Sequence, residues 1–348
     1  MSMKTLEKLR IPLIQGGMGI GISLSGLAGA VAAYGGMGVI STANIGFREP
    51  DFYDNPKEAN KRALRAEIRR AFEIAGGNGM ICVNAMVATS DYEDAVKVAC
   101  EEGVDAIISG AGLPLRLPEL TAGYDVLLGP VVSGAKACST IMKIWERHSG
   151  RKPDFFVAEG QGAGGHLGFS HEDIFYDKCG KDIFDITEEV CKAAKDIPVF
   201  SAGSIFDRKD IEKAKALGAY GAQIGTRFIA TYECDASQEY KDVILKAEEK
   251  DLVCFASPVG MPARGLKTPL IEKVMEGERT EPEKCIGCIR TCRPDETPYC
   301  ITRALIDACL GKYETGLFFA GSNVGRINEM KTVKELILEL FGDDMESI

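Results

Sequence analysis

Short apolar runs alternate with longer amphipathic stretches along most of this chain. The apolar runs are rich in Val, Ile and Phe, and most end in Gly, Ser or Asn, which is typical of buried strands. They predict strands at residues 12–15, 37–41, 80–84, 105–109, 126–130, 154–159, 198–202 and 221–225. The stretches between them predict helices, most clearly at residues 60–75, 91–102 and 207–217.

The regular order of strand and helix indicates how the sheet is built. Continuous apolar strands joined by helices favour a parallel sheet that is covered on both faces. Eight such units over about 225 residues fit an α/β TIM (β/α)8 barrel, a fold of roughly 250 residues. A doubly wound open sheet is the alternative, but it would carry one Gly-rich dinucleotide fingerprint after its first strand. Here glycines follow nearly every strand, so we expect a barrel over residues 1–256.

The strand–helix order stops at about residue 257. Residues 257–325 are rich in Pro, Gly, Cys and charged side chains, with a helical pattern near 299–310. We expect this segment to form a smaller, Cys-rich and mainly helical subdomain, or lid, beside the barrel mouth. Residues 326–348 contain an amphipathic pattern at 332–341, which predicts a C-terminal helix packed on the barrel.

Composition restricts the partners of the chain. With 41 basic and 51 acidic residues, the formal net charge is −10, which argues against nucleic acid or an anionic membrane surface as a partner. No apolar run approaches the roughly 20 residues that span a bilayer, and the N-terminal residues lack the apolar core of a secretion signal. We therefore expect a cytoplasmic protein that acts on a small molecule.

Twelve cysteines are many for a chain without a secretion signal. Seven are scattered between residues 82 and 254, mostly next to apolar positions, and we interpret them as small buried side chains. The other five are close together in the sequence: Cys285, Cys288, Cys292, Cys300 and Cys309. The spacing Cys-x2-Cys-x3-Cys-x7-Cys of the first four is compatible with an iron–sulfur cluster or a zinc site. A set of reduced thiols in a small helical subdomain explains it equally well.

Residues just after the strands of such a barrel face its active site, so these positions carry the candidate chemistry. After the predicted seventh and eighth strands, Gly203 with Ser204 and Gly225 with Thr226 offer backbone N–H groups and hydroxyls. Such groups bind phosphate, and these two loops are the usual phosphate site of the fold. Tight turns alone are the alternative explanation for the glycines.

The loop after the sixth strand, Gly-Gln-Gly-Ala-Gly-Gly-His at 160–166, presents His166 at the mouth. A histidine in a flexible glycine setting suits a general base or a proton-transfer group. The other two histidines suit structural or solvated roles, because His148 ends a helical pattern and His171 lies in a polar run.

Two further positions suit a flat cofactor. The first strand runs into Gln-Gly-Gly-Met-Gly at 15–19, where the backbone at Gly17 could lie against a ring and Met18 could pack on it. Asn84, at the end of the third strand, could hydrogen-bond the edge of a ring. A turn residue that closes the strand is an equally good explanation for Asn84.

Five motifs follow one another between residue 11 and about residue 266. They are Pro-Leu-Ile-Gln-Gly-Gly-Met-Gly at 12–19, Gly-Gly-His-Leu-Gly at 164–168, Ala-Gly-Ser-Ile at 202–205, Ala-Gln-Ile-Gly-Thr-Arg-Phe at 222–228 and Ser-Pro-Val-Gly-Met-Pro at 257–262. Together, in this order, they make the chain resemble the nitronate monooxygenase (2-nitropropane dioxygenase) family. That family also includes the flavin-dependent type II enoyl-acyl-carrier-protein reductases.

The resemblance implies FMN at the barrel mouth, with His166 over the flavin as the catalytic histidine. It implies that the phosphate is held at Gly203, Ser204, Gly225 and Thr226. The other cofactor-binding residues that it implies are Gly17, Met18, Asn84, Gly164, Gly165, Ala202 and Gln223.

The implied activity is FMN-dependent oxidation of alkyl nitronates with O2 to carbonyl compounds and nitrite. The alternative is an NAD(P)H-dependent FMN reductase of enoyl thioesters or other activated alkenes. A non-catalytic FMN-binding barrel is a third hypothesis, which the histidine loop disfavours. Relatives often carry Glu-Ala or Glu-Ser before Gly-Gly-His, whereas this chain has Gly162 and Ala163, so the substrate stays open. An acyl-carrier partner would require a basic patch, which Arg290, Arg293 and Arg303 could supply.

Overall fold

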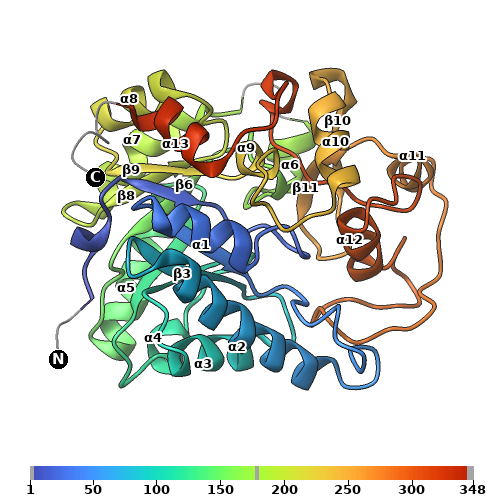
Figure 1. Ribbon diagram of the computed structural model, residues 1–348, viewed down its shortest axis with the longest axis horizontal. Coiled ribbons are helices and arrows are strands. Elements are labelled where there is room, and N and C mark those ends of the chain that lie inside the picture. The colour runs from blue at the N-terminus through green and yellow to red at the C-terminus, as the bar shows by residue number, and fades with distance from the viewer. Residues whose placement is uncertain (1–3, 177–179, 343–348) are drawn as a thin grey trace.

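A closed barrel of eight parallel strands forms the centre of the computed structural model, which describes residues 4–176 and 180–342 (Figure 1). Its strands follow the chain around the barrel: β1 Leu13–Gln15, β2 Met37–Ser41, β3 Met80–Met86, β4 Ala106–Gly110, β5 Leu127–Val132, β6 Phe156–Glu159, β8 Val199–Ala202 and β9 Gly221–Ile224. The barrel closes where β1 pairs with β9, with Ile14 opposite Gln223. The predicted TIM barrel is confirmed, and each barrel strand overlaps a predicted one.

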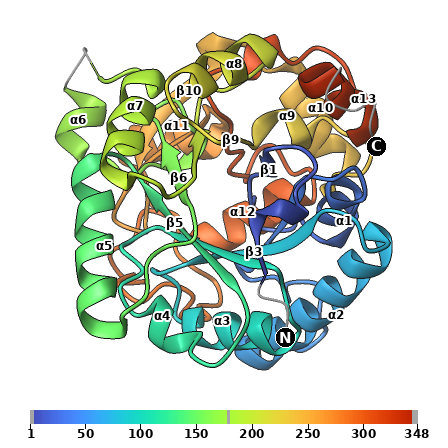
Figure 2. The same ribbon diagram turned by 90° about the vertical axis from the view of Figure 1, so that its left-hand side faces the viewer.

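Helices surround the barrel as an outer ring (Figure 2). The helices that connect successive strands or follow the last one are α1 Ser25–Ala33, α2 Pro56–Ala75, α3 Tyr92–Glu101, α4 Leu117–Leu120, α5 Ala135–Ser149, α7 Ile183–Ala194, α8 Arg208–Ala216 and α9 Thr226–Ile229. Asp207 caps α8 by accepting a hydrogen bond from the Asp210 N–H, as its place before an amphipathic run suggests. The chain also forms α6 His171–Phe175, α10 Gln238–Lys246 and the 3-10 helices η1 Leu6–Lys8, η2 Glu249–Asp251 and η3 Val324–Arg326.

The barrel strands separate two apolar cores, because successive residues of a strand point to opposite faces. Cys82, Phe155 and Val157 point into the barrel interior. Val83 and Phe156, their neighbours in the chain, pack in the core beneath the helices. Every second residue of a strand therefore points into the barrel. The last inward-pointing residue of each strand faces the mouth of the barrel.

A second, three-stranded antiparallel sheet lies at the barrel mouth, in the order β10–β11–β7. Its strands are β7 Gly165–His166, β10 Leu252–Ala256 and β11 Pro262–Leu266. In the pairing of β11 with β7, Ala263 lies opposite His166. None of these strands was expected. Two residues of β7 cannot show an alternating pattern, and the Pro, Arg and Gly of β11 are not typical of strands.

A separate Cys-rich, mainly helical subdomain is not confirmed. Its expected first residue, 257, lies in the turn between β10 and β11. The segment contains α11 Pro269–Met275 and α12 Ile301–Cys309, and the described chain between them has no helix. An apolar cluster that includes Phe255 and Tyr299 packs these parts together. Domain boundaries at 256 and 325 stay predictions.

The C-terminal helix is α13, Val333–Phe341, close to the predicted range. Thr332 caps it by accepting a hydrogen bond from the Glu335 N–H. The helix packs against α1 and α8, whereas residues 343–348 of the predicted C-terminal segment lie outside the described chain. Among residues 4–176 and 180–342, no helix is long and apolar enough to cross a membrane.

Candidate active site at the barrel mouth

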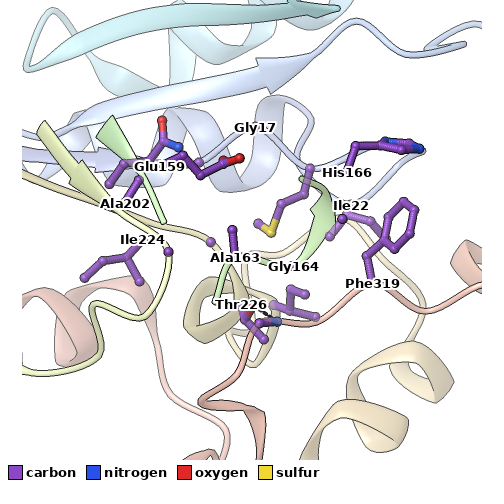
Figure 3. A pocket seen from close by; sticks show the side chains of 18 of the residues that line it. Gly17, Ile22, Glu159, Ala163, Gly164, His166, Ala202, Ile224, Thr226 and Phe319 are labelled. Atoms are coloured by element: carbon purple, nitrogen blue, oxygen red, sulfur yellow. Dashed lines mark hydrogen bonds between the residues drawn. The ribbon is translucent and has the colours of Figure 1, made fainter. Parts of the chain in front are cut away.

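A cavity of about 240 Å³ opens at the carboxyl ends of the barrel strands (Figure 3). Its floor follows from the pleat: Asn84 and Glu159 lie two residues beyond Cys82 and Val157, which point into the barrel core. All the residues expected to act in catalysis or to bind the cofactor line this one cavity: His166, Gly17, Met18, Asn84, Gly164, Gly165, Ala202, Gly203, Ser204, Gln223, Gly225 and Thr226. The fold thus brings together positions that are spread over more than two hundred residues of sequence.

His166 is held in a strand and not in a free loop. Its ring lies edge-on to Phe319, with the ring centroids 5.3 Å apart and the planes at 71°. The ring Nε2 is 2.8 Å from the Ser257 Oγ, which also accepts a hydrogen bond from the Val259 N–H at 3.3 Å. The Ser257 hydroxyl hydrogen is then free to donate to Nε2. We assign the ring proton of His166 to Nδ1 on this basis.

Burial lowers the pKa of His166 to about 4, because a buried site disfavours the charged imidazolium. The histidine is therefore neutral near pH 7. Within the described residues, its Nδ1 has no hydrogen-bond partner and is available to a ligand in the cavity. A neutral N–H donor of this kind stabilises an anion or polarises a carbonyl without giving up its proton.

The two loops expected to hold phosphate lie together, and a third segment joins them. Gly203 and Ser204 both have a left-handed backbone, with φ of +79° and +80°. Asn323 donates from Nδ2 to the Ser204 carbonyl at 2.9 Å, and the Gly321 N–H donates to the Thr226 Oγ1 at 3.0 Å. Residues 321–323 therefore hold both loops in place. This segment could not be recognised from the sequence, because it lies 95 residues or more from its partners and carries only Gly, Ser and Asn.

Another side of the cavity is lined by glycine and by neutral amides. A Cβ at Gly17 would lie 2.4 Å from the Asn84 Cβ, so glycine lets these two strand ends meet. The Gln223 Oε1 is buried and accepts no hydrogen bond among the described residues, although Gln223 lines the cavity. Such an acceptor costs about 1–3 kcal/mol unless a ligand donates to it. This arrangement points to a ligand with an N–H donor.

The family model for nitronate monooxygenase matches residues 1–343. The chain belongs to the nitronate monooxygenase family. A probable nitronate monooxygenase of Staphylococcus saprophyticus is 26% identical over 304 residues, covering 80% of this chain and 81% of that protein. FabK of Thermotoga maritima is 29% identical with a TM-score of 0.74, covering 98% of this chain and 94% of FabK. A nitroalkane oxidase of Streptomyces ansochromogenes shares the fold, with a TM-score of 0.75, 20% identity and coverage of 98% and 97%.

Membership of the nitronate monooxygenase family confirms two expectations from the sequence. The resemblance to this family was correct, and it extends beyond residue 266 to most of the C-terminal segment. The chain is also an oxidoreductase enzyme, of a family that acts on small molecules.

This member of the nitronate monooxygenase family has a carboxyl group in the cavity that was not among the residues expected from the sequence. Glu159 is the last residue of β6, and its side chain points into the cavity (Figure 3). Burial raises the pKa of this carboxyl to about 7. The predicted strand 154–159 contained the signal, because Glu159 follows Phe155 and Val157 at every second position and both of these point into the barrel.

The glycine at position 162 has a structural reason in this nitronate monooxygenase family member. A Cβ there would lie 1.8 Å from the Ser204 Oγ and 2.7 Å from the Ser322 Oγ. These two hydroxyls lie 3.1 Å apart and fill the space of a side chain. The cavity therefore receives its carboxyl group from β6, at Glu159, and none from this position of the loop.

The positions of the clustered cysteines do not support a metal site. In the part of the chain that the structure describes, no group of three or more His, Cys, Asp or Glu side chains is arranged to hold a metal ion. The Cys288 Sγ accepts a hydrogen bond from the Thr302 Oγ1 at 3.0 Å, and the exposed Cys285 accepts one from the Gly287 N–H at 3.4 Å. An iron–sulfur cluster or zinc ion at Cys285, Cys288, Cys292 and Cys300 stays a prediction.

Four of the seven scattered cysteines are buried, as expected: Cys82, Cys100, Cys138 and Cys234. Cys309, from the clustered group, is also buried. Cys191 and Cys254 are half-buried, and Cys179 lies outside the described residues.

Proposed function

We propose that this chain binds FMN at the barrel mouth and oxidises alkyl nitronates with O2 to carbonyl compounds and nitrite. The observation that carries the proposal is the neutral His166, held by Ser257 in a cavity lined by every residue expected to bind FMN. The family of the chain and the probable nitronate monooxygenase of S. saprophyticus support the substrate class.

The lining of the cavity fits FMN in two respects. The pyrimidine edge of the flavin has an N–H donor, which suits the unpartnered Gln223 Oε1. The phosphate oxygens accept hydrogen bonds, which suits the backbone at Gly203 and Ser204 and the hydroxyl of Thr226. Arg227 also lines the cavity, but it pairs with a carboxylate of α13, so backbone N–H groups and hydroxyls would be the main phosphate ligands. When bound, FMN would supply the electron transfer and the reaction with O2.

The side chains of His166 and Ser257 would bind and orient the substrate. A nitronate is an anion whose two oxygens accept hydrogen bonds, and the Nδ1–H of His166 can donate to one of them. Ser257 keeps Nε2 occupied, so the ring stays in one tautomer and one orientation. Because His166 is neutral near pH 7, it holds the anion without protonating it, and the substrate stays in its ionised form. Phe319 packs against the ring and restricts the access of water to this position.

Reduction of an enoyl thioester at the same site is the second candidate. The likeness to FabK, an enoyl-acyl-carrier-protein reductase II, favours it. The Nδ1–H of His166 would then donate to the thioester carbonyl. The surface expected to receive an acyl carrier is largely neutralised, because Arg293 pairs with Glu296 at 3.1 Å and Arg303 with Asp307 at 3.2 Å. We therefore prefer nitronate oxidation.

Anaerobic flavin absorbance distinguishes the two candidates. Purified protein loaded with FMN is mixed with an alkyl nitronate, NADH or NADPH in the absence of O2. We expect the nitronate to bleach the flavin and nitrite to be released when O2 is admitted. Bleaching by a reduced nicotinamide, with none by the nitronate, would reject nitronate oxidation in favour of the reductase.

A His166→Ala variant tests the role of the histidine. Nitronate turnover should fall by about 100-fold or more, while FMN stays bound. His148→Ala, at an exposed histidine of α5, is the matched control and should turn over like the wild type. Unchanged turnover in His166→Ala would remove this residue from the reaction.

A further inference from the structure

One carboxyl group in the cavity has no part in the binding of the nitronate. Glu159 lies on the cavity floor, and its side chain makes no hydrogen bond or ion pair with any described residue. Figure 3 shows its carboxyl directed into the cavity, well separated from His166 and Phe319. The polar neighbours on the floor, Asn84 and Gln223, are neutral amides. A carboxylate in such surroundings is unfavourable, whereas a neutral carboxylic acid is tolerated.

The elements around β6 provide no cation for Glu159. The flanking strands β5 and β8 carry no titratable side chain. Helix α7 packs against β6 and carries these titratable residues: Asp185, Glu188, Glu189, Cys191 and Lys192. Burial alone raises the pKa of Glu159 to about 7, and none of these groups contributes to the shift.

The cavity itself provides no free cation either. Among its described lining residues, the other titratable side chains are His166, Arg227 and Tyr240. His166 is neutral near pH 7, and burial raises the pKa of Tyr240 above its ordinary value. Arg227 lies 3.0 Å from Glu339, donates to the Phe206 carbonyl at 3.0 Å, and so already has its partners. A negative charge on Glu159 would stay uncompensated.

Bound FMN would make that charge still less favourable. Its phosphate brings a charge of about −1.5 to −2 into the same cavity. A cofactor in this cavity would also displace water from around the carboxyl. In its neutral form, Glu159 can instead donate its O–H to an acceptor on the ring edge.

We propose that Glu159 is a cofactor-binding carboxylic acid that has to carry its proton for FMN to bind tightly, so that FMN binding takes up a proton from solvent above neutral pH. The inference rests on the proposed FMN site. With half of the free carboxyl ionised at about pH 7, the apparent Kd for FMN should weaken about 30-fold between pH 5.5 and pH 8.5 through this group.

The test compares the wild type with Glu159→Gln, which keeps the size of the side chain but cannot ionise. FMN is titrated into each apoprotein at pH 5.5, 7.0 and 8.5, and binding is followed by the change in flavin fluorescence. The FMN phosphate titrates alike in both experiments, so the ratio of the two Kd values isolates Glu159. We expect the ratio of wild type to variant to rise about 30-fold over this range. Glu146→Gln, at an exposed position of α5, should follow the wild type at every pH.

A second measurement needs only the wild type. In weakly buffered solution at pH 8, FMN binding should take up about 0.9 proton per site, recorded with a pH indicator. A Kd ratio that is constant across pH, or the absence of proton uptake by the wild type, would overturn the role of Glu159 and leave the FMN site standing. A chain that binds no FMN at any pH would overturn the proposed function instead.

Discussion

The stability of the folded chain in acid should depend on His166. Burial lowers its pKa from 6.5 to about 4, so between these values the unfolded chain binds a proton here and the folded chain does not. Stability is therefore unaffected by this group above about pH 7.5, and it is lost progressively as the pH falls below 6.5. At pH 5 the difference in proton binding amounts to about 2 kcal/mol of the free energy of unfolding.

A His166→Asn variant removes this titration and keeps a polar side chain near Ser257. The free energy of unfolding is measured in urea on the FMN-free protein. Between pH 7.5 and pH 5 it should fall by about 2 kcal/mol more in the wild type than in the variant. The loss of the hydrogen bond to Ser257, worth about 1 kcal/mol, lowers the free energy of unfolding of the variant equally at both pH values. It therefore cancels in this comparison. His148→Asn, at an exposed histidine, should lose as much as the wild type.

An equal loss in the wild type and His166→Asn would refute the reasoning. It would mean that the folded chain accepts a proton at His166 near pH 5, so that water or an anion reaches the ring. The proposal that His166 binds the nitronate as a neutral donor would then have to be replaced by binding through an ion pair.

Particular contacts lead to three more expectations. Gly162→Ala puts a Cβ 1.8 Å from the Ser204 hydroxyl and should weaken FMN binding about tenfold or more in a fluorescence titration. Gly134→Ala is the control and should bind FMN normally, because its Cβ would meet nothing within 4 Å. Equal affinities of the two variants would contradict this account. Ser257→Ala frees the Nε2 of His166 and should lower kcat about tenfold with a smaller change in KM, measured by oxygen uptake. An unchanged kcat would speak against the tautomer assignment. Iodoacetamide should label the exposed Cys285 before Cys288, as followed by mass spectrometry, because burial raises the pKa of the Cys288 thiol to about 11. The reverse order of labelling would contradict this burial.

The barrel could be predicted because its signal is local. Each strand is buried on both faces, so it appears in the sequence as a short apolar run, and the helices between strands show their own periodicity. The fold then places every strand end at one mouth, which is why Asn84 and Gly203 could be expected there without knowledge of their contacts, whereas Gln223 was assigned from the family resemblance. Glu159 obeys the same rule and could have been selected from the alternation alone.

The supports of the site could not be predicted in this way. Ser257 reaches His166 across 91 residues, and Asn323 reaches Ser204 across 119. Such pairs leave no periodic pattern, since each depends on one loop meeting another in the folded chain. The two-residue strand β7 forms for the same reason: its partner β11 lies almost a hundred residues further on.

Because β7 pairs with β11, the histidine strand cannot be exchanged separately from its C-terminal partners in protein engineering. A barrel that ended at residue 256 would keep the cavity-lining residues of the strand ends but lose β11, Ser257 and Phe319, all of which hold the histidine. The Phe319 segment is itself attached to β11 through a bridge to Gly265. A chimera that exchanges the histidine loop between relatives must therefore carry its distant C-terminal partners with it. We expect a change of substrate in this enzyme to require joint changes in the histidine loop, β11 and the Phe319 segment.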